Sequence, residues 1–157
     1  MPWEKESARR HLMTYAGGFV YHFGIFAALS WLFFQIMSLN VGEFMTGALG
    51  ILTGAGLLAG LGLFVKRGLR PMMRSISCPD DYVANLLVDI FLGTALVSMF
   101  VPELKTVLYA VTMLLLLYIP LGKIRHCIFF FYSRIMFGRF FGRRGVFPRA
   151  NDPFRQV

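Results

Sequence analysis

Charged residues are scarce in this chain of 157 amino acids, where they make up 15% of the total while 57% of the residues are hydrophobic. A soluble domain normally carries about 25% charged residues, so this balance excludes an ordinary soluble protein. Acidic residues are the scarcer sign, with 8 Asp and Glu against 16 Lys and Arg. The composition therefore predicts a protein embedded in a membrane.

Cysteine is almost absent, because Cys78 and Cys127 are the only two. They form no CxxC motif, which excludes an iron–sulfur cluster with cysteine ligands and a c-type haem within this chain. We expect no disulfide between them either, since the chain places Cys78 in a loop that should face a reducing compartment. Any iron–sulfur chemistry would belong to a partner.

The chain contains several long apolar stretches. A membrane-spanning helix needs about 20 apolar residues, and four stretches qualify, at 13–37, 44–65, 82–101 and 107–132. They predict an all-α integral membrane protein, a four-helix transmembrane bundle in a single domain over 1–157. Pro120 should kink the last helix. Aromatic and basic residues alternate beyond it, which predicts an amphipathic tail over 133–157 on the membrane surface.

The basic residues lie in a pattern that indicates topology. All of the Lys and Arg except Lys105 lie before the first stretch, between the second and third, or after the core of the last. By the positive-inside rule, both termini and the middle loop face the cytoplasm. This explains the net charge of +8 without nucleic acid. It also predicts contact between the tail and anionic lipids.

Two of the three histidines, His22 and His126, lie within apolar stretches. A polar side chain inside a bilayer is costly unless it is paired, so each is a candidate functional residue. In the predicted topology their depths are similar, and two facing imidazoles are the axial ligands of a b-type haem. His11 lies among charged neighbours, where an interfacial position fits better, so the chain should hold one haem or none. Simple hydrogen bonding across helices is the alternative, and zinc lacks further ligands at that depth.

Two further patterns in the apolar stretches remain open between structure and function. Asn85 and Asp89 are four residues apart and therefore share a helix face. They could hydrogen-bond between helices or exchange protons beside a quinone. Glycines at 50, 54, 56 and 60 would let another helix, or a flat macrocycle, approach closely.

Three separated motifs resemble the respiratory nitrate reductase gamma subunit family. They are YHFGIF at 21–26, KRGLRPMMRSISCPDDY at 66–82 and YIPLGKIRHCIFFFYSR at 118–134. The same domain occurs in membrane subunits of heterodisulfide-reductase-like and sulfate-reducer redox complexes. The resemblance implies a cytochrome b subunit in a prokaryotic inner membrane. It implies electron exchange between the quinone pool and a cytoplasmic iron–sulfur subunit, within a hetero-oligomeric complex.

The resemblance also assigns candidate cofactor residues. His22 and His126 match the ligands of the haem nearer the cytoplasm in that family. Lys123, Arg125 and Arg74 are candidate partners of the haem propionates, because carboxylates near a membrane face need cations. The alternative for these three cations is that they serve topology alone.

The departures from the family pattern are as specific as the match. Family members with two haems have histidines where this chain has Leu32 and Leu108, and both belong to the haem farther from the cytoplasm. The pattern therefore predicts one haem b, and a quinone site at the lost haem is no longer implied. We also expect no counterpart of a family helix that precedes the first span. A cofactor-free structural or assembly subunit and a small transporter remain alternative functions, although the inverted repeats of transporters are missing.

Overall fold

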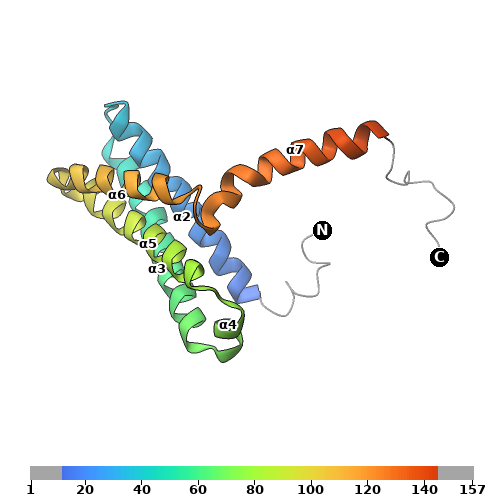
Figure 1. The fold of residues 1–157 in the computed structure, drawn as a ribbon. Coiled ribbons are helices and arrows are strands. Elements are labelled where there is room, and N and C mark those ends of the chain that lie inside the picture. The colour runs from blue at the N-terminus through green and yellow to red at the C-terminus, as the bar shows by residue number, and fades with distance from the viewer. Residues whose placement is uncertain (1–11, 145–157) are drawn as a thin grey trace.

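The computed structural model describes residues 12–144, which form helices and turns and contain no strand. Four helices make a bundle, and a fifth leaves it (Figure 1). In chain order the elements are α2 (Leu12–Ile36), α3 (Glu43–Leu69), α4 (Pro71–Ile76), α5 (Pro79–Phe100), the 3-10 turn η2 (Pro102–Leu104), α6 (Lys105–Tyr118), the 3-10 turn η3 (Lys123–Arg125) and α7 (His126–Arg144). His11 and residues 145–157 of the predicted tail lie outside the described part.

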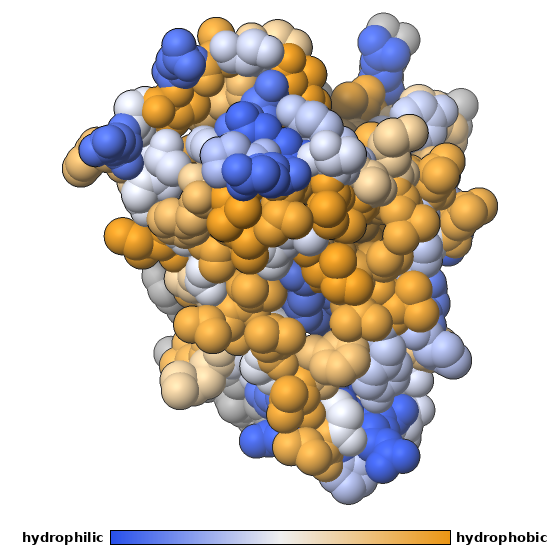
Figure 2. Space-filling view, turned by 90° about the vertical axis from the view of Figure 1, so that its left-hand side faces the viewer, coloured by the Kyte–Doolittle hydropathy of each residue, from blue (hydrophilic) through white to orange (hydrophobic). Residues whose placement is uncertain are grey.

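Three helices, α2, α3 and α5, are long and apolar enough to cross a membrane. Their bounds agree with the predicted spans 13–37, 44–65 and 82–101, because polar or turn-forming residues bound each apolar run. One face of the molecule is largely apolar across its middle, with hydrophilic residues gathered towards the top and bottom (Figure 2). The described chain is thus all-helical, with three membrane-spanning candidates and a fourth if a bent pair is counted as one.

The bent pair replaces the single kinked helix predicted for 107–132. In the structure α6 ends at Tyr118, and the segment that resumes at Lys123 is turned from it by 80°. Pro120 lies within this break, where its ring and missing N–H prevent the helix from continuing. The kink is confirmed, and it is large enough to divide the segment into two helices.

The closest helix crossing in the bundle joins α2 to α3 at two glycines. A Cβ atom on Gly24 would lie 2.5 Å from the Cα of Gly56, and one on Gly56 would lie 2.6 Å from the Cα of Gly24. Only hydrogen at both positions permits this approach, which is the role small residues play in membrane helix packing. Of the two options for the glycines of α3, close helix packing is therefore observed at Gly56.

The core of the bundle is centred on α5, which packs against α2, α3 and α6. Phe91 and Leu92 of α5 are almost completely buried. Leu32 and Leu108 belong to the same core and are 7% and 0% exposed. Side chains therefore fill this part of the bundle.

Candidate functional site

His22 lies on α2, immediately after the buried Tyr21, and its ring is exposed on the outside of the bundle. Nδ1 lies 2.7 Å from the carbonyl oxygen of Gly18, one turn earlier. A carbonyl can only accept, so Nδ1 carries the proton, and in the neutral ring Nε2 keeps its lone pair. The described residues provide no hydrogen-bond partner for this Nε2.

His126 repeats this arrangement in the other apolar segment. It is the first residue of α7, it is exposed, and its Nδ1 donates to the carbonyl oxygen of Lys123 at 2.8 Å. Metal-ligating histidines usually donate one ring N–H to a carbonyl or carboxylate and bind the metal through the other nitrogen. Both membrane histidines have that hydrogen-bond pattern.

The two histidines are separate in this structure. Each ring bonds to a carbonyl of its own segment, and within residues 12–144 no hydrogen bond or ring contact joins the two. Hydrogen bonding between His22 and His126 across helices is therefore not observed. Packing of α7 against the rest of the described chain is confined largely to η3, and its side chains from His126 to Phe140 are exposed.

An open groove of about 540 Å³ lies beside His126. Its volume falls within the usual range for cofactor and ligand sites. Its lining includes two cations and three aromatic rings, in a set that comprises Lys123, Arg125, His126, Phe129, Phe130, Tyr132 and Ser133. This combination suits a flat apolar ring system that carries carboxylates, which is the chemistry of haem. His22 is not part of the groove.

The three candidate propionate partners differ in their surroundings. The ammonium group of Lys123 lies 2.7 Å from Asp81 Oδ1 and is already paired. Arg125 lines the groove and has no ion pair with the described residues. Arg74 lies on α4, which packs on α3, and is not a lining residue. The structure therefore brings Lys123 and Arg125 next to His126 and leaves Arg74 apart.

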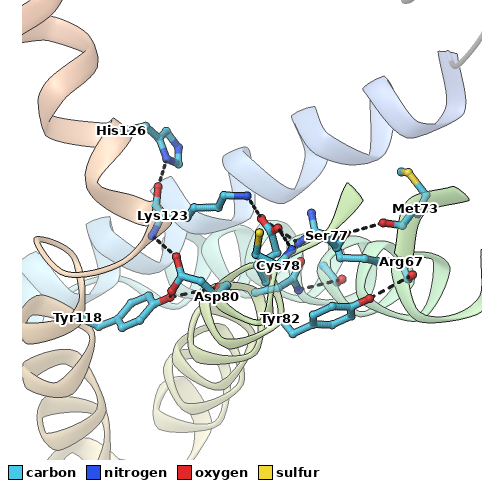
Figure 3. A network of polar contacts seen from close by, with 12 residues as sticks. Arg67, Met73, Ser77, Cys78, Asp80, Tyr82, Tyr118, Lys123 and His126 are labelled. Atoms are coloured by element: carbon cyan, nitrogen blue, oxygen red, sulfur yellow. Dashed lines mark hydrogen bonds and ion pairs between the residues drawn. The ribbon is translucent and has the colours of Figure 1, made fainter. Parts of the chain in front are cut away.

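A polar network that the sequence analysis missed holds the break between α6 and α7 against the start of α5 (Figure 3). Asp80 accepts hydrogen bonds from both sides of the break. Tyr118, the last residue of α6, donates its hydroxyl to Asp80 Oδ1, and the backbone N–H of Lys123 donates to Oδ2 at 2.9 Å. Gly122 makes room for this geometry, since a Cβ there would lie 2.6 Å from Tyr118 Oη.

Asp81 adds charge to the same network. Besides Lys123, its Oδ1 faces the guanidinium of Arg67 at 3.6 Å, and its Oδ2 accepts the backbone N–H of Cys78 at 2.9 Å. Two carboxylates after Pro79 in the first turn of a helix are a recognisable start signal, and they also complement the helix dipole. The CPDDY sequence contains that start signal, but it does not show that Tyr118 and Lys123 are the partners of the two carboxylates.

Asn85 and Asp89 share a face of α5, as their spacing predicted, and that face lies between helices. The Asn85 amide donates to Asp89 Oδ2 at 2.7 Å and to the carbonyl of Gly60 on α3 at 3.3 Å. The Tyr21 hydroxyl of α2 donates to the backbone carbonyl oxygen of Asn85 at 3.4 Å. Asp89 is 5% exposed, and its Oδ1 has no hydrogen bond from the described residues. This cluster joins α2, α3 and α5 by partly buried hydrogen bonds.

Comparisons of the chain with protein-family models, with curated proteins and with solved structures gave no match.

Proposed function

We propose that the chain is a haem b-binding membrane subunit of a respiratory oxidoreductase complex. It would exchange electrons between the quinone pool and a cytoplasmic iron–sulfur partner subunit. The observation that supports the proposal is the hydrogen bonding of the two histidine rings in apolar segments. Each uses Nδ1 to anchor its ring to a backbone carbonyl and leaves Nε2 exposed without a protein partner among the described residues. An exposed imidazole in a lipid-facing segment is costly unless Nε2 has a ligand to bind.

The residue types suit one haem b, although His22 lies outside the groove that His126 lines. His22 and His126 would hold the iron, and Arg125, with Lys123 beside it, would pair with the propionates. When bound, the haem supplies one-electron transfer. Ligation by both rings would join α2 to α7, two helices without a hydrogen bond between them in the described structure. Leu32 and Leu108 fill the core, which favours one haem over two.

A cytoplasmic location of both termini belongs to the same proposal. It is supported by the distribution of basic residues, and it would place the groove on the side of the iron–sulfur partner in a prokaryotic inner membrane. Reporter fusions at Val157 and near Ser75 should behave as cytoplasmic, and a fusion near Asn40 should not. A non-cytoplasmic signal from the C-terminal fusion would contradict this orientation.

The direct experiment is a reduced-minus-oxidised absorption spectrum of membranes that contain the protein. We expect a b-type band and about one haem per chain, since one pair of membrane histidines is available. His22→Ala and His126→Ala should each abolish the low-spin bis-histidine signal, whereas His11→Ala should leave it intact. If no band appears, the cofactor-free structural subunit becomes the better interpretation. A normal spectrum in His126→Ala would show that another residue or subunit provides the second ligand.

A further inference from the structure

We propose that Asp80 and Asp81 are positioning residues for His126, acting through Lys123. The proposal rests on the proposed function, because positioning His126 matters for activity only if His126 is a haem ligand. It changes the role of Lys123, which the sequence suggested as a propionate partner. In the structure Lys123 connects the start of α5 to the imidazole (Figure 3).

The first connection runs through the backbone. Asp80 Oδ2 accepts the N–H of Lys123 at 2.9 Å, and the carbonyl of Lys123 accepts Nδ1–H of His126 at 2.8 Å. The backbone N–H of Lys123 is therefore bound to a carboxylate of α5, and its backbone carbonyl is bound to the imidazole ring of α7. Since Nδ1 and Nε2 belong to one rigid ring, the position of this carbonyl sets the direction in which Nε2 points.

The second connection runs through the side chain. Asp81 Oδ1 binds the ammonium of Lys123 at 2.7 Å, and Arg67 of α3 donates to the Asp81 carbonyl oxygen at 2.9 Å. Asp81 is thereby fixed to α3 as well as to Lys123. Its side chain is 13% exposed, against 54% for that of Lys123, so the carboxylate is the sheltered member of the pair.

This network is the main described interaction that can set the direction of α7. The other described packing of this helix is slight, and its side chains from His126 to Phe140 are exposed. Tyr118 and Lys123 lie on opposite sides of the 80° break, and Asp80 binds both. Removing that carboxylate removes the hydrogen bonds to both sides of the break at once, and the Asp81–Lys123 ion pair is then the remaining polar connection of the network between α5 and this segment.

The two cysteines provide a test that does not depend on haem. Cys78 precedes α5 and Cys127 follows His126, and both are free and exposed. Nitroxide labels on this pair report the position of α7 relative to α5 through dipolar EPR. We expect one narrow distance distribution in the unaltered protein and a broad one in Asp80→Ala and in the Asp80→Ala/Asp81→Ala double variant. Asp81→Glu, which keeps the carboxylate, should restore most of the narrow distribution that Asp81→Ala loses.

Glu103→Gln is the matched control, because it removes one exposed acidic charge at the opposite end of α5. Far-UV circular dichroism of each variant separates loss of position from loss of fold. An unchanged distance distribution in the folded double variant would overturn the proposal.

The second readout concerns the haem itself. Outer partners of a metal-ligating histidine typically contribute about 10-fold to 100-fold in metal affinity. We expect a loss of that order in haem affinity, together with a shift of the haem midpoint potential, in Asp80→Ala, and no change in Glu103→Gln. If the unaltered protein binds no haem, the proposed function fails while the EPR result still decides the positioning proposal. Unchanged haem affinity and potential in Asp80→Ala, in a protein that does bind haem, would overturn the link to His126.

Discussion

The crossing of α2 and α3 gives a stability prediction whose size follows from the geometry. In Gly56→Ala the new methyl carbon would lie 2.6 Å from Gly24 Cα and 3.4 Å from the carbonyl oxygen of Tyr21. Carbon atoms are in best contact at about 3.5–4.0 Å, so the helices must separate locally by about 1 Å. The atoms in the way are backbone, and no side chain can rotate to relieve the overlap. Overpacking of this kind costs about 1–3 kcal/mol.

Gly62→Ala on the same helix is the control for this prediction. Nothing lies within 4 Å of a Cβ at Gly62, and both substitutions gain the same helix propensity of about 1 kcal/mol. Unfolding by dodecyl sulfate in mixed micelles, followed by far-UV circular dichroism, would measure both. We expect Gly56→Ala to be about 1–3 kcal/mol less stable than Gly62→Ala. Equal stability of the two variants would refute the reasoning that backbone contact at this crossing requires glycine.

Three further predictions use other contacts of the structure. Ser98→Ala removes the acceptor of the Trp31 indole N–H at 3.0 Å inside the core, which should lower the free energy of unfolding by about 1–3 kcal/mol in the same assay; no change would mean that the indole finds another partner. Gly122→Ala should lower the thermal midpoint because its methyl group overlaps the Tyr118 ring, whereas Gly138→Ala on α7, where the space is open, should not. Asp89→Asn should slow quinone-linked electron transfer per haem while haem content is kept, and normal turnover would leave Asp89 as a structural group that joins helices.

The helices could be predicted from the sequence because their causes are local. Apolar runs bounded by polar residues define α2, α3 and α5 to within a few residues, and the ring of Pro120 predicts an interruption wherever it falls in a helix. The angle at that interruption could not be predicted in the same way. It depends on Asp80, which lies 38 residues before Tyr118 and reaches both sides of the break.

In the candidate site too, features set by neighbouring residues could be predicted, and contacts between distant residues could not. The spacing of Asn85 and Asp89 fixed their common face, and the structure bears this out. The hydroxyl of Tyr21 and the carbonyl of Gly60, which complete that cluster, come from other helices and leave no signal near residue 85. Likewise, no sequence pattern shows that Lys123 bonds to Asp81 while Arg125, beside the groove, has no ion pair among residues 12–144. The joint ligation of one iron by His22 and His126 stays a prediction.

The shortness of α6 has a consequence for the lipids around it. Its 14 residues extend about 21 Å, against about 30 Å for the hydrocarbon thickness of a typical bilayer. The 25 residues of α2 extend about 38 Å and cross with length to spare. A bilayer that fits α2 is therefore thicker than α6 is long, so α6 alone does not cross it, and we expect the bilayer to thin locally on that side of the bundle. Lipids with shorter acyl chains should accordingly gather along α6 and stabilise that side of the bundle.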